Sequence, residues 1–445
     1  MKSRVLLVYL PGIEIGYGPI FPLGIGYLLA SLKTERPTKA VHFENMDQAF
    51  ALLPNVMGTF APDIVGLTCS SFNRGNVRKV CKWIRAYYPN IKIIIGGVHA
   101  SFFPDQMIHE YGADFVVIGE GEITLSELCK AIDGEDIDSV KGIAYKTGKS
   151  ATMHTSPRDP ISNLDSIAIP DYNYAYRMMK NSGLGFVFTA RGCPARCNFC
   201  STTSYWGQKV RVHSVARVVD EIEILVEKYG TRKILFHDDT FNLSIKRVMD
   251  ICNEITSRGI RITWAASCRV HPVSQEMIDK MVEAGCRHIC WGIESGSPQM
   301  LAKLNKKITQ EQIKTAYEMC RKHIGTISVG AFAMVGNPGE SEKTIQESVR
   351  FINTLPMTDS PGAAVLYILP GTKVYEDVKK REPNIDTFWT KSDSTLRPQE
   401  YSIIRLQQWA TMVANSGERV PFDRSKHFFN GVLFGNLPAP VEEDL

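Results

Sequence analysis

The chain has 445 residues, of which 44% are hydrophobic and 22% are charged, and its formal net charge is +4. A chain of this length and composition can bury two sizeable cores, and so small a net charge gives no electrostatic reason to expect a nucleic-acid partner. The longest apolar runs, residues 91–97 and 329–335, are too short to span a bilayer, and there is no secretory leader, so we expect a cytoplasmic protein without a transmembrane segment.

Residues 1–148 alternate short apolar runs with stretches of helical periodicity. Apolar runs of this kind are typical of strands that are buried on both faces. The pattern predicts a doubly wound, Rossmann-like α/β domain with a parallel sheet of about five strands. We predict strands at residues 4–10, 40–43, 63–68, 91–95 and 114–118, and helices at 23–32, 76–88, 104–111 and 124–132.

Small and polar residues follow the strands of this predicted domain. Ligands of doubly wound sheets bind at the carboxyl ends of the strands, and small residues there let a bulky ligand approach the backbone. A glycine after a strand is more often a turn residue, so each loop is weak evidence when taken alone. The candidate loops are a glycine-rich stretch at residues 11–19 and the later strand ends with Thr68, Ser70, Gly96, Gly97, His99, Glu120 and Gly121.

The order and spacing of these motifs, with Phe-Pro-Leu-Gly at residues 21–24, resemble the cobalamin-binding domain that precedes the barrel of many radical S-adenosylmethionine enzymes. The resemblance implies that these strand-end residues contact cobalamin, with the Thr/Ser pair and the glycine pair beside its nucleotide tail. Residues 10–24 contain no histidine, so it further implies that no histidine of this loop binds the cobalt. A domain that keeps the fold without the cofactor is the alternative.

A second alternation of strands and helices follows a linker at residues 149–182, after a hairpin expected at 142–155. Six βα units between residues 183 and 376 predict a partial (β/α)6 TIM barrel with its helices outside and its active face at the carboxyl ends of the strands. The predicted strands are 185–189, 233–236, 261–265, 287–292, 326–335 and 362–368, and the helices are 214–229, 245–257, 274–284, 309–323 and 341–355.

Three cysteines follow the first strand of the predicted barrel. Cys193, Cys197 and Cys200 have the spacing Cys-x-x-x-Cys-x-x-Cys, and three thiolates on one loop can hold three irons of a four-iron cluster while the fourth iron binds a small molecule. A structural zinc site needs a fourth ligand, and a disulfide framework does not suit a long chain with 11 cysteines. The pair Cys286 and Cys290 is predicted to be two core thiols, and the other six cysteines lie singly, so the sequence does not support an auxiliary cluster.

Polar residues also follow the later strands of the barrel, where they are costly unless they bind a ligand or one another. With the cysteine motif, they make the whole domain resemble the radical S-adenosylmethionine superfamily. The resemblance implies a [4Fe-4S] cluster on the three cysteines and S-adenosylmethionine on the fourth iron. Each residue has a structural alternative, such as a helix cap for the aspartates or an ion pair between Glu294 and Arg269. The implied S-adenosylmethionine contacts are Phe199 and Gly336 for the adenine, Asp238 or Asp239 for the ammonium, Arg269 for the carboxylate, and Glu294 with Ser295 for the ribose or the ammonium.

Residues 377–445 are predicted to form a small helical region with one amphipathic helix at 399–414. We expect Trp409, Met412 and the aromatic residues of 429–434 to cover the open edge of the barrel, and the acidic end at 441–445 to lie in solvent. By resemblance, this region contributes to the substrate pocket.

The resemblance implies that an electron donor such as flavodoxin or ferredoxin reduces the cluster, and that S-adenosylmethionine is cleaved to a 5'-deoxyadenosyl radical. The leading hypothesis is cobalamin-dependent methylation of an unactivated carbon or phosphorus of a small-molecule substrate. A second hypothesis is an oxidative cyclase or a carbon-carbon coupling enzyme whose first domain does not hold cobalamin. A third is an electron carrier without catalysis, which has no use for polar residues at the strand ends.

Overall fold

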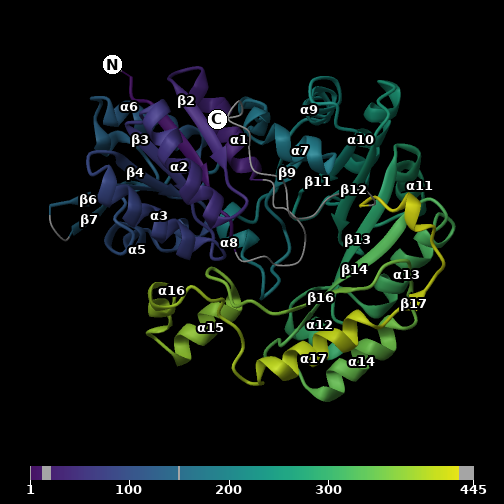
Figure 1. Ribbon diagram of the computed structural model, residues 1–445. Helices are drawn as coiled ribbons and strands as arrows, with labels where there is room; N and C mark the ends of the chain where they lie inside the picture. The colour runs from purple at the N-terminus through teal and green to yellow at the C-terminus, as the bar shows by residue number, and fades with distance from the viewer. Residues whose placement is uncertain (1, 13–21, 149–150, 430–445) are drawn as a thin grey trace. The chain divides into compact units, whose positions relative to one another are not determined.

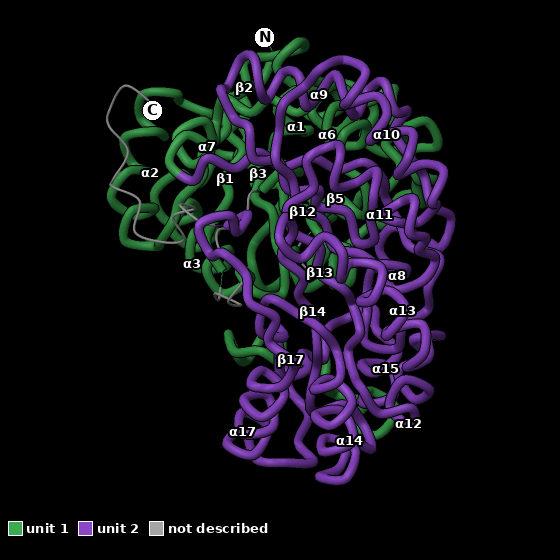
Figure 2. The backbone as a smooth tube through the Cα atoms, turned by 90° about the vertical axis from the view of Figure 1, so that its right-hand side faces the viewer, with its two compact units in different colours: residues 1–181, 379–395, 433–445 green, residues 182–378, 396–432 purple. Residues whose placement is uncertain are grey.

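The computed structural model describes residues 2–12, 22–148 and 151–429. They fold into two compact units, which Figure 2 colours separately. Of the described residues, the first unit contains the chain up to Asn181 and a later segment, Lys379–Thr395, and the second contains Ser182–Val378 and residues 396–429. The chain thus returns to the first unit after it has built the second sheet.

Within the described residues, the first unit holds a seven-stranded sheet in the order β2-β1-β3-β4-β5-β6-β7. The strands β1 to β5 pair in parallel, which confirms the doubly wound fold. The five predicted parallel strands are present, and the predicted hairpin, β6-β7, pairs antiparallel with β5 and so extends the sheet. The strands are β1 (Val5–Tyr9), β2 (Thr38–His42), β3 (Ile64–Thr68), β4 (Lys92–Gly96), β5 (Phe115–Val117), β6 (Ile143–Thr147) and β7 (Ala151–His154).

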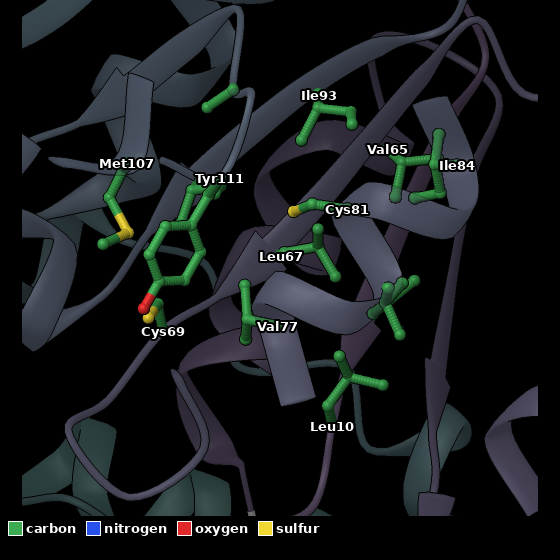
Figure 3. Packing of buried hydrophobic residues seen from close by; sticks show 14 of the residues in the cluster. Leu10, Val65, Leu67, Cys69, Val77, Cys81, Ile84, Ile93, Met107 and Tyr111 are labelled. Atoms are coloured by element: carbon green, nitrogen blue, oxygen red, sulfur yellow. The ribbon is translucent and has the colours of Figure 1, made fainter. Parts of the chain in front are cut away.

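Both faces of this sheet are covered by helices, as Figure 1 shows. Side chains alternate along β1, so that Leu6 and Val8 enter one hydrophobic cluster while Val5 and Leu7 enter the other. Helices α2, α3 and α5 supply the first cluster, part of which appears in Figure 3, and α1 and α6 supply the second. The helices are α1 (Leu23–Lys33), α2 (Met46–Phe60), α3 (Arg74–Tyr87), α4 (Val98–Phe102), α5 (Pro104–His109), α6 (Gly121–Ile132) and α7 (Tyr176–Ser182).

Helix α2 is absent from the elements predicted above, because Pro54 and Gly58 interrupt its helical pattern. It forms nevertheless. The side chain of Asn45 caps its first turn by accepting a hydrogen bond from the Gln48 N–H, and its apolar face, which includes Leu53, is buried. Tertiary packing therefore outweighs local propensity here.

The second unit holds a six-stranded parallel sheet in the order β16-β14-β13-β12-β11-β8, within the residues described. This sheet is the predicted partial barrel, and the strand order follows the chain. Figure 1 shows helices α9 to α14 along its outer side. Its elements are β8 (Leu184–Val187), β11 (Lys233–Phe236), β12 (Thr263–Cys268), β13 (Cys286–Glu294), β14 (Ser328–Val335), β16 (Gly362–Val365), α9 (Val215–Glu227), α10 (Ile245–Ser257), α11 (Gln275–Glu283), α12 (Pro298–Lys303), α13 (Gln310–Arg321) and α14 (Glu342–Ile352).

The outer helices begin at side-chain caps that the sequence encodes locally. The hydroxyls of Ser214, Ser244, Ser274, Thr309 and Ser341 each accept the backbone N–H of the residue three positions later. Such caps fix where each helix starts, and hence the length of the preceding loop at the carboxyl end of its strand. The smaller elements of this unit are β9 (Ala190–Arg191), β10 (Arg211–Val212), α8 (Thr202–Trp206), β15 (Pro356–Met357) and β17 (Glu418–Arg419).

The C-terminal part contains α15 (Lys373–Arg381), α16 (Phe388–Lys391) and α17 (Ile403–Ala414). Helix α17 packs against β14, β16 and α14, and its Trp409 is buried, so the expected cover of the open sheet edge at β16 is confirmed for this residue. Met412 is 39% exposed, and its part in that cover stays a prediction. Residues 430–434 and the acidic end at 441–445 lie outside the described residues. Among the helices described, none is long and apolar enough to cross a membrane.

Candidate functional site

The three predicted cluster cysteines lie on the loop between β9 and α8. The loop begins at Gly192, whose φ of +92° suits glycine, and it is then held by backbone contacts. The Asn198 N–H donates to the Leu304 carbonyl, the Asn198 amide donates to the Lys303 carbonyl, and the Val374 N–H donates to the Asn198 carbonyl. The middle of the loop is thus fixed by chain segments from two other parts of the second unit.

The thiols of this loop are free and differ in exposure. Cys193 is buried at 8% exposure, while Cys197 and Cys200 are partly exposed. The sulfur of Cys193 lies 3.8 Å from Thr240 Oγ1, and that of Cys200 lies 3.2 Å from Thr202 Oγ1. Three unpaired thiols on one anchored loop are the soft donor set that an iron-sulfur cluster requires, so the residues present fit that group.

The adjacent aspartates that follow β11 have different environments. Asp238 is 5% exposed, and its carboxylate accepts hydrogen bonds from the Thr189 N–H at 2.6 Å, the Thr189 hydroxyl at 2.6 Å and the Ala190 N–H at 3.0 Å. Burial raises the pKa of Asp238 to about 6, although these hydrogen bonds oppose the shift. The carboxylate is therefore committed to the turn between β8 and β9.

Asp239 instead faces the cysteine loop. Its Oδ1 accepts a hydrogen bond from Thr202 Oγ1 at 2.9 Å, and the same hydroxyl oxygen lies beside the sulfur of Cys200. The side chain is exposed, so it remains accessible to a cation. Of the two candidates for the ammonium group, only Asp239 has a carboxylate that is directed toward the thiols.

Arg269, after β12, also reaches the cysteine loop. Its Nη1 lies 3.9 Å from the sulfur of Cys197, and its Nη2 donates to the Lys306 carbonyl at 2.7 Å. The backbone at Arg269 is fixed by the buried Asn242, whose amide side chain both accepts from the Arg269 N–H and donates to its carbonyl. A guanidinium held in this way is available for a carboxylate beside the thiols.

Glu294, at the end of β13, forms an ion pair that was not predicted. Its Oε1 lies 2.8 Å from Lys306 Nζ, with both side chains nearly buried, so the alternative pairing with Arg269 is wrong. Lys306 Nζ also lies 5.9 Å from the ring centroid of Phe199, the aromatic residue before the third cysteine. Glu294, Lys306 and Phe199 therefore form one group next to the cysteine loop.

Ser295 and Gly336 are bound to the protein itself. The Ser295 hydroxyl is buried and lies 2.9 Å from Ser348 Oγ, on the outer helix α14. The N–H of Gly336 donates to Glu340 Oε2 at 2.5 Å, and burial raises the pKa of Glu340 to about 7. These contacts turn both polar groups toward α14 or its preceding loop, and leave the predicted ligand contacts of Ser295 and Gly336 as predictions.

In the first unit, the carboxyl ends of β1 and β3 meet at a single side chain. The amide of Asn73 donates to the Leu10 and Thr68 carbonyls, and its Oδ1 accepts the Ser70 N–H at 2.7 Å. The strand order β2-β1-β3 reverses between β1 and β3, which is where doubly wound sheets bind their ligands. Thr68 and Ser70 thus lie at the switch point of the sheet, whereas residues 13–19 of the glycine-rich loop lie outside the described residues.

The neighbouring strand ends carry glycines, which differ in the space around them. Gly97 has a φ of +97°, and a Cβ there would lie 2.8 Å from both the Cys69 carbonyl oxygen and Thr68 Oγ1. Gly96 and Gly119 differ, because a Cβ at Gly96 would meet nothing closer than 3.6 Å and one at Gly119 would meet nothing within 4 Å. Gly97 is therefore required by the packing of β3 against β4, whereas Gly96 and Gly119 would tolerate a Cβ, and the cobalamin contacts implied for Gly96 and Gly97 stay predictions.

The side chains of His99 and Glu120 contact the protein itself, and their implied cobalamin contacts stay predictions. His99 is fully buried; its Nδ1 lies 2.9 Å from Ser71 Oγ, and its ring lies 5.4 Å from that of Trp389. Burial and, to a lesser degree, the nearby Arg74 guanidinium together lower the pKa of His99 to about 3. Glu120 Oε2 accepts the Ile161 N–H at 2.7 Å, so this carboxylate anchors the chain that follows the hairpin. Gly121 opens helix α6 and packs against Leu28.

Several side chains of the site were missed from the sequence, namely Thr202, Thr240, Lys306, Asn242 and Glu340. Thr202 stands two residues after the last cysteine and Thr240 one residue after Asp239, so position in the motif was an available signal for both. Lys306 follows helix α12 and Glu340 follows a short loop after β14, and the fold brings both back to the strand ends. Periodicity carries no signal for such residues.

Two family models match the chain. The radical SAM superfamily model matches residues 187–352, and the B12 binding domain model matches residues 16–129. An uncharacterized methyltransferase of Pyrococcus horikoshii is 34% identical over 389 residues, which cover 84% of this chain and 83% of the relative. The cytidylyl-2-hydroxyethylphosphonate methyltransferase of Streptomyces wedmorensis is 28% identical over 390 residues, which cover 74% of this chain and 72% of the relative.

A solved structure has the same fold. The radical S-adenosylmethionine methyltransferase TsrM from Kitasatospora setae, with cobalamin and a [4Fe-4S] cluster bound, superposes with a TM-score of 0.75 and 22% sequence identity. The match covers 91% of this chain and 80% of that chain.

Proposed function

The chain belongs to the radical SAM superfamily, to the group whose members also carry a B12 binding domain, and on this basis we propose that it methylates an unactivated carbon or phosphorus of a small-molecule substrate. The observation that carries the proposal is the grouping of Cys197, Cys200, Asp239 and Arg269 at the carboxyl ends of the barrel strands. Methyltransferase relatives over most of the chain support methyl transfer as the outcome.

In the proposed mechanism, Cys193, Cys197 and Cys200 would hold three irons of a [4Fe-4S] cluster. When bound, the cluster supplies an electron for cleaving S-adenosylmethionine, and cobalamin supplies a carrier for the methyl group. Asp239 receives the ammonium of S-adenosylmethionine, and Arg269 receives its carboxylate, because each offers the opposite charge beside the thiols. These two contacts would fix the position of S-adenosylmethionine beside the cysteine loop.

The remaining residues shape the site. Phe199 offers an apolar ring for the adenine, and the Lys306-Glu294 ion pair offers donors and acceptors to the ribose without exposing an unpaired charge. In the first unit, Thr68, Ser70 and the glycines at the neighbouring strand ends would hold cobalamin. The electron donor is of the flavodoxin or ferredoxin type, and the protein works in the cytoplasm.

The test uses protein that is purified and reconstituted with iron, sulfide and cobalamin without oxygen. With a reductant and S-adenosylmethionine, it is expected to form 5'-deoxyadenosine and, with substrate, S-adenosylhomocysteine and a methylated product. Cys197→Ala abolishes 5'-deoxyadenosine, whereas the matched control Cys320→Ala, at a fully buried thiol in α13, leaves it in place. If Cys197→Ala retained 5'-deoxyadenosine formation, the cluster assignment would be wrong. Substrate turnover without S-adenosylhomocysteine would instead indicate the cyclase or coupling alternative.

A further inference from the structure

The hydroxyl of Thr202 lies between a cluster cysteine and the carboxylate proposed for S-adenosylmethionine. Its Oγ1 is 3.2 Å from the sulfur of Cys200 and 2.9 Å from Asp239 Oδ1. In the protein without a cluster, the Cys200 thiol donates to Thr202, and Thr202 in turn donates to Asp239. The three groups therefore form a chain of hydrogen bonds in which every proton has one acceptor.

Iron binding removes one proton from this chain. Cys200 binds iron as a thiolate, which has no proton to donate, so the only proton left between the sulfur and Asp239 is the one on the Thr202 hydroxyl. A hydroxyl has a single O–H donor. It can serve the carboxylate or the thiolate, and the carboxylate oxygen is the better acceptor as long as nothing else binds it.

We propose that Thr202 turns its hydroxyl from Asp239 to the Cys200 sulfur when the ammonium group of S-adenosylmethionine binds Asp239. This inference rests on the proposed function, because it takes the cluster and the ammonium contact from there. The ammonium brings its own N–H donors to Asp239 and so replaces the hydrogen bond that Thr202 gives up. Thr202 is thus a positioning residue that connects ligand binding to the cluster.

The consequence is that S-adenosylmethionine binding and reduction of the cluster favour each other. When one electron from an external reductant enters the cluster, the negative charge on its sulfur ligands increases, and an O–H donated to Cys200 stabilises the reduced form. Binding of S-adenosylmethionine therefore raises the reduction potential of the cluster. By linkage, reduction of the cluster tightens S-adenosylmethionine binding by the same factor. The cluster is then easiest to reduce when the molecule to be cleaved is in place.

The position of Thr202 argues against a purely structural role. Thr202 opens the short helix α8, whose N-cap residue is Ser201, and the hydrogen bonds of its Oγ1 lead to Cys200 and Asp239 rather than into the helix. Removing the hydroxyl while keeping the shape of the side chain is therefore expected to change the reduction potential of the cluster and to leave α8 intact.

The experiment is a redox titration of the reconstituted cluster, followed by electron paramagnetic resonance, with and without S-adenosylmethionine. The variants are Thr202→Val, which keeps the shape without the hydroxyl, and Thr202→Ser, which keeps the hydroxyl. S-adenosylmethionine is expected to raise the reduction potential of the cluster in wild type, and by about 59 mV less in Thr202→Val. For one electron, this difference equals a tenfold smaller effect of cluster reduction on the affinity for S-adenosylmethionine. Thr202→Ser is expected to keep the wild-type shift.

An equal shift in wild type and Thr202→Val, at full iron content and with S-adenosylmethionine bound in both, would overturn the inference while leaving the proposed function in place. A wild-type protein that binds no [4Fe-4S] cluster would instead refute the proposed function. If Thr202→Val assembles no cluster, Thr202→Ala is used in its place. The shift of the reduction potential in Thr202→Ala is then compared with that in Thr202→Ser, and equal shifts overturn the inference.

Discussion

The guanidinium carbon of Arg74, on α3, lies 4.7 Å from the ring centroid of Trp389, a residue that follows the entire second sheet in the chain. Arg74 Nη2 also donates to the Ser392 and Ser394 carbonyls at 2.5 and 2.6 Å. Arg78 adds an ion pair to Asp393 at 2.5 Å. The segment Lys379–Thr395 is thereby fixed on the first unit, although its own sequence is polar.

The anchoring role of Trp389 predicts a large loss of stability on truncation. Trp389 is fully buried against Arg74 and the ring of His99, so Trp389→Ala is expected to lower the free energy of unfolding by about 3–5 kcal/mol. Tyr87→Ala, at an aromatic residue that is 70% exposed, is the matched control and is expected to cost about 0.5 kcal/mol or less. Urea unfolding followed by circular dichroism measures both. Equal midpoints for the two variants would show that the segment does not stabilise the protein.

The two adjacent aspartates are expected to respond in opposite ways. Asp238→Asn places an N–H group where the carboxylate accepts hydrogen bonds from Thr189 and Ala190, so it is expected to cost about 1–3 kcal/mol of folding stability. Asp239→Asn is expected to change stability by less than about 0.5 kcal/mol and to weaken S-adenosylmethionine binding by about tenfold or more, because it removes the charge that faces the ammonium. Unfolding curves and equilibrium dialysis on reconstituted protein separate the two effects. The reverse pattern would identify Asp238 as the ammonium contact.

Glu340 predicts a pH dependence of stability. It is buried beneath the turn after β14, where it accepts the N–H groups of Gly336 and Asn337, and burial raises its pKa to about 7 from an ordinary value of 4.5. The folded protein therefore binds this proton more tightly than the unfolded chain. The resulting stability is present at low pH and is lost as the pH rises from about 4.5 to about 7, by on the order of 3 kcal/mol.

Glu340→Gln carries no titrating group and is expected to lack this contribution. The measurement is the difference in unfolding free energy between wild type and Glu340→Gln at several pH values from 5 to 8. A difference that stays constant over this range would contradict the raised pKa.

Asp359 is expected to hold the last described segment of the chain. Its carboxylate lies 3.0 Å from His427 Nε2 and 2.5 Å from an Arg424 nitrogen, and His288 Nδ1 lies 3.4 Å away. Burial alone would raise the pKa of Asp359, but the hydrogen bonds from both histidines hold it well below its usual range. Asp359→Asn is therefore expected to speed hydrogen exchange at residues 423–429 about tenfold. Asp105→Asn, at an exposed pairing with His154, is the control and is expected to leave that exchange unchanged.

His288, Asp359 and His427 have the residue types of a metal site, and their ligand atoms lie within 4.8 Å of one another. Two contacts disfavour a cation there. Arg424 already neutralises the carboxylate, and His427 Nδ1 accepts the Phe429 N–H, which leaves the proton on the Nε2 that would have to bind the metal. We therefore interpret these three residues as a hydrogen-bonded group that fixes residues 423–429 to the second unit.

The alternation of strands and helices was predictable because it depends on local signals. Buried apolar runs mark the parallel strands of both sheets, and Ser or Thr marks the start of the outer helices, as at Ser244 and Thr309. The cysteine spacing identifies the loop that faces the carboxyl ends of the barrel strands. These features require no knowledge of which residues meet across the fold.

The partners of individual side chains were not predictable in this way. Asp238 and Asp239 are identical neighbours in the sequence, yet one is enclosed by the turn between β8 and β9 and the other faces the thiols, because successive side chains at a strand end point in opposite directions. Glu294 pairs with Lys306 rather than Arg269 because the backbone after α12 brings Lys306 back to the strand end. Such pairings depend on loop conformation, which hydrophobic periodicity does not encode.

The return of Lys379–Thr395 to the first unit restricts how this architecture can be rearranged in evolution. A single recombination joint placed after Asn181 would transfer the first sheet without Trp389 and would uncover the His99 side chain. The two units are therefore not interchangeable modules. A successful exchange of the first unit needs two joints, one after Asn181 and one that also transfers Lys379–Thr395. We therefore expect the first sheet and this segment to be inherited together.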